Sequence, residues 1–292
     1  MRGRGVEVSK TLFYIWRNIR MNREQLYNIY QTNLELLENE LVQVKRMAQA
    51  NLGKLCYAKL EEKELGEIQK REKDVLGITR LYTFLLCSWL EARIKKILYE
   101  GSSVAFTEAE RNQILSARKM SCKWKKCFNM AVCKSYGFIF KSNKNNYTDC
   151  FGNRKEELYC YQKVLKYLDD IKQAITVRNR LAHGQWETQL NYEETRMAGP
   201  EVYDFLNQYD NVQKLDMLYS IYKIIAEIIS SYVVYKDKNV TNNFNDTMIK
   251  KIKEIENFHQ RIEKSNFEKY CKPFMIKEKS EYKNRKKVYI KE

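Results

Sequence analysis

A three–four alternation of apolar positions runs from about Asn22 to Asp74, a stretch without proline. This spacing is typical of a long helix or a helical hairpin with a coiled-coil-like seam. The pattern occupies eleven positions, and all of them except Asn51 and Glu62 are apolar. These positions are Tyr30, Leu34, Leu37, Leu41, Val44, Ala48, Asn51, Leu55, Ala58, Glu62 and Leu65. Gly53 is interpreted as a kink or a turn between two arms. Residues 1–75 are therefore expected to form a helical arm whose seam packs on the rest of the chain or on a second copy.

A more densely apolar segment follows between Leu76 and Glu100. Apolar residues occupy most of its circumference, which predicts a helix in the centre of a bundle. Its narrow polar stripe runs through Ser88, Glu91 and Lys95. The Glu91 carboxylate either reaches the bundle interior or pairs with Lys95 four residues later, and the pair is favoured.

The remaining pattern is also helical. Thr107 and Glu110 have the spacing of a capping box that opens a helix. From Glu156 one apolar face continues to Gly184, which is well placed to end that helix. The later elements are an apolar helix over about 211–235, a linker over 239–246, and a charged helix followed by a mobile basic tail. No strand-period segment stands out, so the chain is predicted to be all-α, with a bundle over 76–235 and a basic carboxyl-terminal part over 236–292.

The amino-acid composition indicates the class of protein. Apolar residues make up 44% of the 292-residue chain and charged residues 31%, which is typical of a soluble protein with highly charged helix surfaces. The start lacks a signal-peptide pattern, and the most apolar stretches are too short or too polar to indicate a membrane span, so a cytoplasmic protein without a membrane partner is expected. The eight cysteines form no Cys-x-x-Cys pair, and reduced, partly buried thiols are favoured over a metal site. No cofactor is expected.

The net charge of +16 is concentrated in two stretches. Residues 111–148 contain nine Lys or Arg and no acid, and residues 250–292 contain fourteen against seven acids. Concentrated basic charge indicates a polyanion-binding surface, and a solvated lysine-rich surface is the alternative. Lys119, Lys123, Lys125 and Lys126 are candidate RNA contacts.

Aromatic residues alternate with the lysines of the acid-free stretch. They are Trp124, Phe128, Tyr136, Phe138, Phe140 and Tyr147. Ammonium groups that follow phosphates and rings that stack on bases suit single-stranded nucleic acid. We expect most of these rings to lie in the core and one or two to be exposed.

The strongest candidate for chemistry is the stretch 177–186, which holds one of only two histidines. Asn179 and His183 are four residues apart, so they share one helix face and the amide can orient the imidazole. Arg178 lies about 140° around the axis from His183, and its long side chain can still reach the same pocket. Arg180 is a further candidate RNA contact. The second histidine, His259, lies in a charged helix and is interpreted as a surface residue.

Arginine, asparagine and histidine are the groups that RNA cleavage without a metal requires. The neighbouring 2′-hydroxyl is the nucleophile in such a reaction. Histidine moves protons near neutral pH, and arginine grips phosphate oxygens with two parallel hydrogen bonds. The products are a 2′,3′-cyclic phosphate and a free 5′-hydroxyl.

The sequence Arg178-Asn179-Arg180-Leu181-Ala182-His183 resembles the Arg–polar–three residues–His signature of the HEPN superfamily. The order of elements over residues 76–235 is also similar. The resemblance implies a four-helix bundle and metal-independent endoribonuclease activity of the toxin–antitoxin or antiphage-defence kind. It also implies a homodimer that brings two motifs together, and an antitoxin or defence-system protein as a partner. Arg178 and His183 would be catalytic and Asn179 supporting, while Glu91 corresponds only loosely to a polar residue that some members use.

Two other interpretations remain open. One is a catalytically silent HEPN-like RNA-binding or assembly module, which would bind RNA with a salt-dependent affinity and leave it intact. The other is a coiled-coil scaffolding protein whose histidine only caps a helix. Such a scaffold would neither bind nor cleave RNA.

Overall fold

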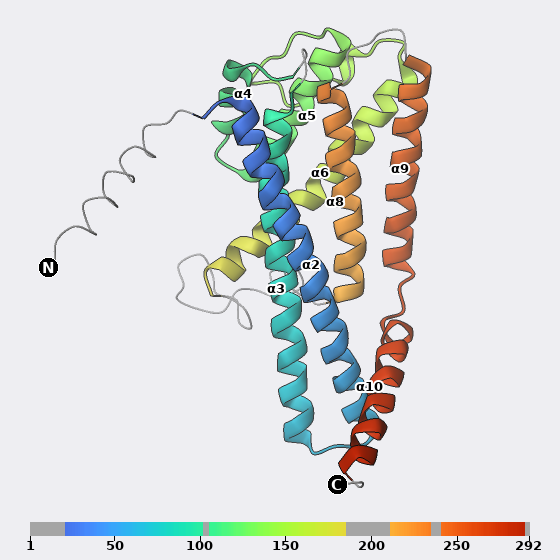
Figure 1. Cartoon of the computed structure of the whole chain (residues 1–292). Coiled ribbons are helices and arrows are strands. Elements are labelled where there is room, and N and C mark those ends of the chain that lie inside the picture. Colours follow the sequence, from blue (N-terminus) through green and yellow to red (C-terminus); the bar gives the residue numbers. More distant parts are fainter. Residues whose placement is uncertain (1–20, 102–104, 185–210, 235–240, 290–292) are drawn as a thin grey trace, which may run out of the picture.

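The computed structural model describes residues 21–101, 105–184, 211–234 and 241–289 (Figure 1). Every regular element in these ranges is a helix, which confirms the all-α class. In chain order the elements are α2 (Arg23–Leu60), α3 (Leu65–Tyr99), α4 (Glu108–Leu115), α5 (Met120–Tyr136), the short 3-10 helix η1 (Thr148–Cys150), α6 (Lys155–Ala182), α8 (Val212–Val234), α9 (Thr241–Glu263) and α10 (Phe267–Tyr289).

Helices α2 and α3 form a long hairpin, and they lie side by side along the length of the molecule (Figure 1). Asn22 and Gln25 form a capping box at the start of α2, which then runs without interruption for 38 residues. Gly53 lies inside this helix, so the expected kink or turn there is wrong. The chain reverses instead between α2 and α3, where Glu62 adopts a φ of 49°. The apolar seam predicted for α2 packs largely inward.

Helices α3, α5, α6 and α8 contact one another in every pairing and surround a common core. Each contributes at least one large aromatic side chain that is almost completely buried: Trp89 from α3, Trp124 from α5, Tyr161 from α6 and Tyr222 from α8. Thr107 and Glu110 form the predicted capping box at α4. This four-helix core holds the end of α6, which carries the Arg–Asn–His motif.

The boundary expected at residues 75 and 76 falls inside α3, which is continuous from Leu65 to Tyr99. Leu34, Leu41 and Val44 of α2 belong to the same buried cluster as the four-helix core. The amino-terminal hairpin is therefore an extension of the bundle and not a separate arm. Its seam is covered by α3, α8 and α10 of the same chain.

The carboxyl-terminal part differs most from the expectation. α9 begins at Thr241, inside the expected linker, and packs on α6 and α8 with Met248, Ile252 and Ile255 buried. The residues expected to form a mobile basic tail instead belong to α10, which lies along α2 (Figure 1). Packing decides this, because a short apolar face is enough to hold a charged helix against α2.

α10 approaches α2 closely at Gly53. A Cβ atom added there would lie 2.6 Å from the carbonyl oxygen of Phe274 and 3.0 Å from its carbonyl carbon. Backbone atoms cannot move aside as a flexible side chain can. The α2–α10 contact therefore requires glycine at position 53.

We expect Gly53→Ala to destabilise the protein by about 1–3 kcal/mol, because the added methyl group pushes α10 away from α2. Gly77→Ala is the matched control, since Gly77 lies in α3 with no atom within 4 Å of the added Cβ. That variant should be neutral or more stable by about 0.5–1 kcal/mol, the ordinary gain of alanine over glycine in a helix. Urea unfolding of both variants measures the difference, and equal stabilities would refute the close approach.

Helices α3 and α8 are long and apolar enough to cross a membrane by length and composition. Within the bundle, 44% and 56% of their most apolar windows are buried. Core helices of soluble proteins pass the same test, so this property carries no conclusion about location.

Candidate active site

The stretch 177–186 closes α6, and its last two residues lie outside the described part of the chain. Val177 and Leu181 are buried and hold this end of the helix against the core. His183 is the residue that caps the helix, and Gly184 follows with a φ of 77°. Glycine adopts this left-handed conformation at little cost, which explains why α6 ends here as predicted.

The half-buried guanidinium of Arg178 is held by α3. Its Nη2 lies 3.1 Å from the Oε2 of Glu91, and the two side chains are 28% and 26% exposed. The guanidinium also lies 5.9 Å from the ring centre of Phe84. The favoured pairing of Glu91 with Lys95 is therefore wrong, and the Lys95 ammonium lies over the ring of Tyr30 instead. Because α6 crosses α3 here, the long-range pair replaces the local one.

Asn179 contacts the arginine beside it. Its Oδ1 accepts a hydrogen bond of 3.2 Å from Nη1 of Arg178. The expected contact of the Asn179 amide with the His183 imidazole is not formed, and the link between these residues is the backbone hydrogen bond from His183 N to Asn179 O at 3.1 Å. In this arrangement Asn179 and Glu91 together position the guanidinium.

His183 lies on the exposed face of α6. Lys172, Thr176, Asn179 and His183 follow one another at intervals of four, three and four residues, and all four are exposed. Arg178 points toward α3, about 140° around the helix. The imidazole is thus accessible from solvent, and the guanidinium is partly enclosed. The two groups lie on different sides of the same helix end.

A pocket of about 420 Å³ opens beside this cluster, between α3, the start of α5, and α6. Glu91 and Asn179 form part of its wall. Its four cations come from two segments that are far apart in sequence: Arg118, Lys119, Lys123 and Lys172. Lys119 and Lys123 were predicted to contact RNA, whereas Arg118 and Lys172 were missed. The spacing of Lys172 from Asn179 and His183 on one helix face is the signal that could have found Lys172.

The other predicted RNA contacts lie elsewhere. Lys125 is exposed on α5 but does not line the pocket. The ammonium of Lys126 donates a hydrogen bond of 3.1 Å to the carbonyl oxygen of Gln113, and this contact anchors α5 to α4. Arg180 is half-buried and also lies outside the pocket. His259 is half-buried and stacks on Tyr167 at 5.4 Å, so it is not the surface residue that was expected.

The aromatic residues of the acid-free stretch belong to the core. Trp124, Phe128 and Tyr147 are buried, and the other three are half-buried against the core. None of these six described side chains is exposed, so the expectation of one or two exposed rings is wrong.

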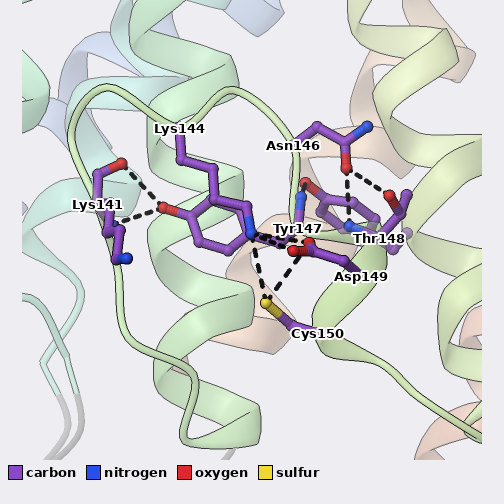
Figure 2. A network of polar contacts seen from close by, with 8 residues as sticks. Lys141, Lys144, Asn146, Tyr147, Thr148, Asp149 and Cys150 are labelled. Atoms are coloured by element: carbon purple, nitrogen blue, oxygen red, sulfur yellow. Dashed lines mark hydrogen bonds and ion pairs between the residues drawn. The ribbon is translucent and has the colours of Figure 1, made fainter.

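Tyr147 organises the loop that precedes α6 (Figure 2). Its hydroxyl accepts a hydrogen bond of 2.7 Å from Lys141 N and donates one of 2.9 Å to Lys141 O. The ammonium of Lys144 lies 2.7 Å from Asp149, and this contact lowers the pKa of the Asp149 carboxyl. Tyr147 is thus a folding residue, and the Lys144 charge is already balanced.

The cysteines do not form a catalytic centre at this site. All eight are free thiols. Cys87, which is near Arg178, donates a hydrogen bond of 3.1 Å to Ala174 O, and burial raises the pKa of its thiol so that it stays protonated. Within the described ranges, no three His, Cys, Asp or Glu side chains gather in a way that would hold a metal ion.

Comparisons of the chain with protein-family models, with curated proteins and with solved structures gave no match. The site is therefore interpreted from its own chemistry. A positively charged pocket beside a positioned arginine attracts a phosphodiester, and an exposed histidine near it is able to exchange protons.

Proposed function

We propose that this protein is a metal-independent endoribonuclease of the HEPN type, with Arg178 and His183 as catalytic residues. The observation that carries the proposal is the position of Arg178. Its guanidinium is oriented by Glu91 and Asn179, and these two residues also line a pocket with four cations on its wall. Electrostatic attraction places the phosphodiester of RNA in that pocket.

The reaction follows from the groups present. His183 accepts the proton of the 2′-hydroxyl, whose oxygen then bonds to phosphorus. The bond from phosphorus to the 5′-oxygen breaks, that oxygen takes up a proton from water, and the protonated His183 returns its proton to solvent. Arg178 stabilises the additional negative charge on the phosphate oxygens while both bonds are partly formed. Glu91 holds Arg178 until the phosphate competes for the guanidinium.

A site composed of two chains explains the geometry better than a site within one chain. Arg178 faces α3, whereas His183 lies on the exposed face of α6. In a homodimer that joins the exposed faces of two α6 helices, the His183 of one protomer would approach the Arg178 of its partner. The exposed row of Lys172, Thr176 and Asn179 would then lie at the interface.

The proposal is tested by incubating the purified protein with total RNA and mapping the new ends. We expect cleavage in the presence of a chelator, with 2′,3′-cyclic phosphate and 5′-hydroxyl ends. Cleavage that the chelator abolishes would contradict the mechanism. RNA that is bound but stays intact would favour the silent binding module, and a protein that neither binds nor cleaves RNA would favour a scaffold.

The pocket makes a separate prediction about RNA affinity. Replacing Lys119, Lys123 and Lys172 together by alanine should weaken RNA binding by on the order of tenfold and reduce its dependence on salt, because three phosphate contacts are lost. Lys125→Ala is the matched control, since Lys125 is exposed on the same helix outside the pocket. RNA affinity is measured for both variants by fluorescence anisotropy at several salt concentrations. If Lys125→Ala weakened RNA binding as much as the triple variant does, RNA would not bind in this pocket.

A further inference from the structure

A second cavity, of about 950 Å³, lies between the start of α8, the end of α9 and the start of α10. It shares no lining residue with the pocket beside Arg178. Its volume falls within the range of about 300–1,000 Å³ that is usual for sites of small molecules and cofactors. The cavity is therefore large enough for a ligand of nucleotide size.

Among the residues that the structure describes, the charged side chains that line this cavity are all cations: Arg261, Lys264 and Lys269. None of the three forms an ion pair with any residue that the structure describes. All three cations are exposed to solvent, and their combined positive potential attracts a ligand with several negative charges.

One face of α9 supplies much of the cavity wall. Asn257, Gln260, Arg261 and Lys264 are spaced by three, one and three residues, so they lie on the same side of the helix. Asn266 also lines the cavity and caps α10 by accepting a hydrogen bond of 2.8 Å from Lys269 N. The partial positive charge at the start of α10 adds to that of the side chains.

The opposite wall is suited to a neutral, flat group. Met217 and Tyr270 form an apolar part, and the Tyr270 hydroxyl is already engaged by Gln49 Nε2 at 2.9 Å. The Oε1 of Gln213 is buried and has no hydrogen-bond partner. A buried acceptor without a partner is unfavourable, and a rotation of the Gln213 side chain toward the cavity would let the amino group of a nucleobase satisfy it.

We propose that this cavity binds a nucleoside triphosphate, with the phosphates at Arg261, Lys264 and Lys269 and the base between Gln213 and Met217. The cations suit the polyanionic end of such a ligand. The amides of Gln213, Asn257 and Gln260 offer both donors and acceptors to the edge of the base. This inference is independent of RNA cleavage, because none of these residues belongs to the candidate active site.

The test is calorimetric titration of the full chain with ATP, GTP and inorganic triphosphate without added metal. ATP or GTP should bind at least about tenfold more tightly than triphosphate, since only the nucleotides contact the neutral wall. Arg261→Ala and Lys264→Ala should each weaken nucleotide binding by about tenfold. Gln213→Ala should weaken nucleotide binding but leave triphosphate binding unchanged.

Lys250→Ala is the matched control, because Lys250 is exposed on α9 and lies outside the cavity. Its nucleotide affinity should equal that of the unchanged protein, and circular dichroism should show that all variants retain their helices. The proposal is overturned if neither ATP nor GTP binds, if triphosphate binds as tightly as both, or if Lys250→Ala weakens binding as much as Lys264→Ala.

Discussion

His183→Ala is expected to reduce RNA cleavage by about a hundredfold or more, because the proposed reaction would lose its proton-transfer group. The exposed position of His183 at the end of α6 means that this substitution leaves the core intact. Gln162→Ala is the matched control, since Gln162 is exposed on the same helix and lies outside the pocket and the exposed row. Initial cleavage rates on a defined RNA, together with melting temperatures, provide the comparison. Equal cleavage by the unchanged protein and by His183→Ala would refute the proposed activity.

Arg178→Ala should reduce cleavage by a similar factor of about a hundred, and Arg178→Lys should restore only part of it because lysine lacks the two-pronged contact with phosphate. Mixing the two inactive variants tests the dimer. In a composite site, a heterodimer of Arg178→Ala with His183→Ala contains one arginine and one histidine that face each other, so some activity should return. A site within one chain would remain inactive in both subunits.

The second large effect concerns stability. Trp89→Ala should destabilise the protein by about 3–5 kcal/mol, because it removes a large buried ring and leaves a cavity. Trp89 is 1% exposed, its Nε1 donates a hydrogen bond of 3.0 Å to Glu38, and its ring packs edge-on against Tyr219 at 5.3 Å. One side chain thus connects α3 to α2 and α8.

Leu36→Ala in α2 is the control for this prediction, because Leu36 is 60% exposed and should change the unfolding free energy by less than about 0.5 kcal/mol. Both variants are measured by urea unfolding at equilibrium. A loss for Trp89→Ala as small as that for Leu36→Ala would mean that the hairpin and the bundle do not share one core.

Much of the helical architecture was predictable from local pattern. The seam of α2, the capping box at Thr107 and the end of α6 at Gly184 all depend on residues within a few positions of one another. Local periodicity and helix caps act over this distance, so the sequence alone determines them. The same reasoning failed at Gly53 and in the last helix, where the partner lies on a remote segment.

The candidate site was only partly predictable. Position along the sequence indicated Arg178, Asn179 and His183 as a group, but not which of them would contact one another. The pairing of Arg178 with Glu91 joins residues 87 positions apart, and it arises only because α6 crosses α3 at this level. The packing of α6 on α5 likewise brings Lys172 close to Arg118 and Lys119 around one pocket.

The sequence by itself thus determined the all-α class, most helix positions and the residues of the motif. Only the tertiary structure decided that the amino-terminal hairpin and the two last helices belong to the body of the fold. It alone decided that all six aromatic residues among the lysines are covered, and that Arg178 pairs with Glu91 of α3. The physical reason is that apolar periodicity specifies which face of a helix is buried, whereas the neighbour that covers this face depends on how all the helices pack together.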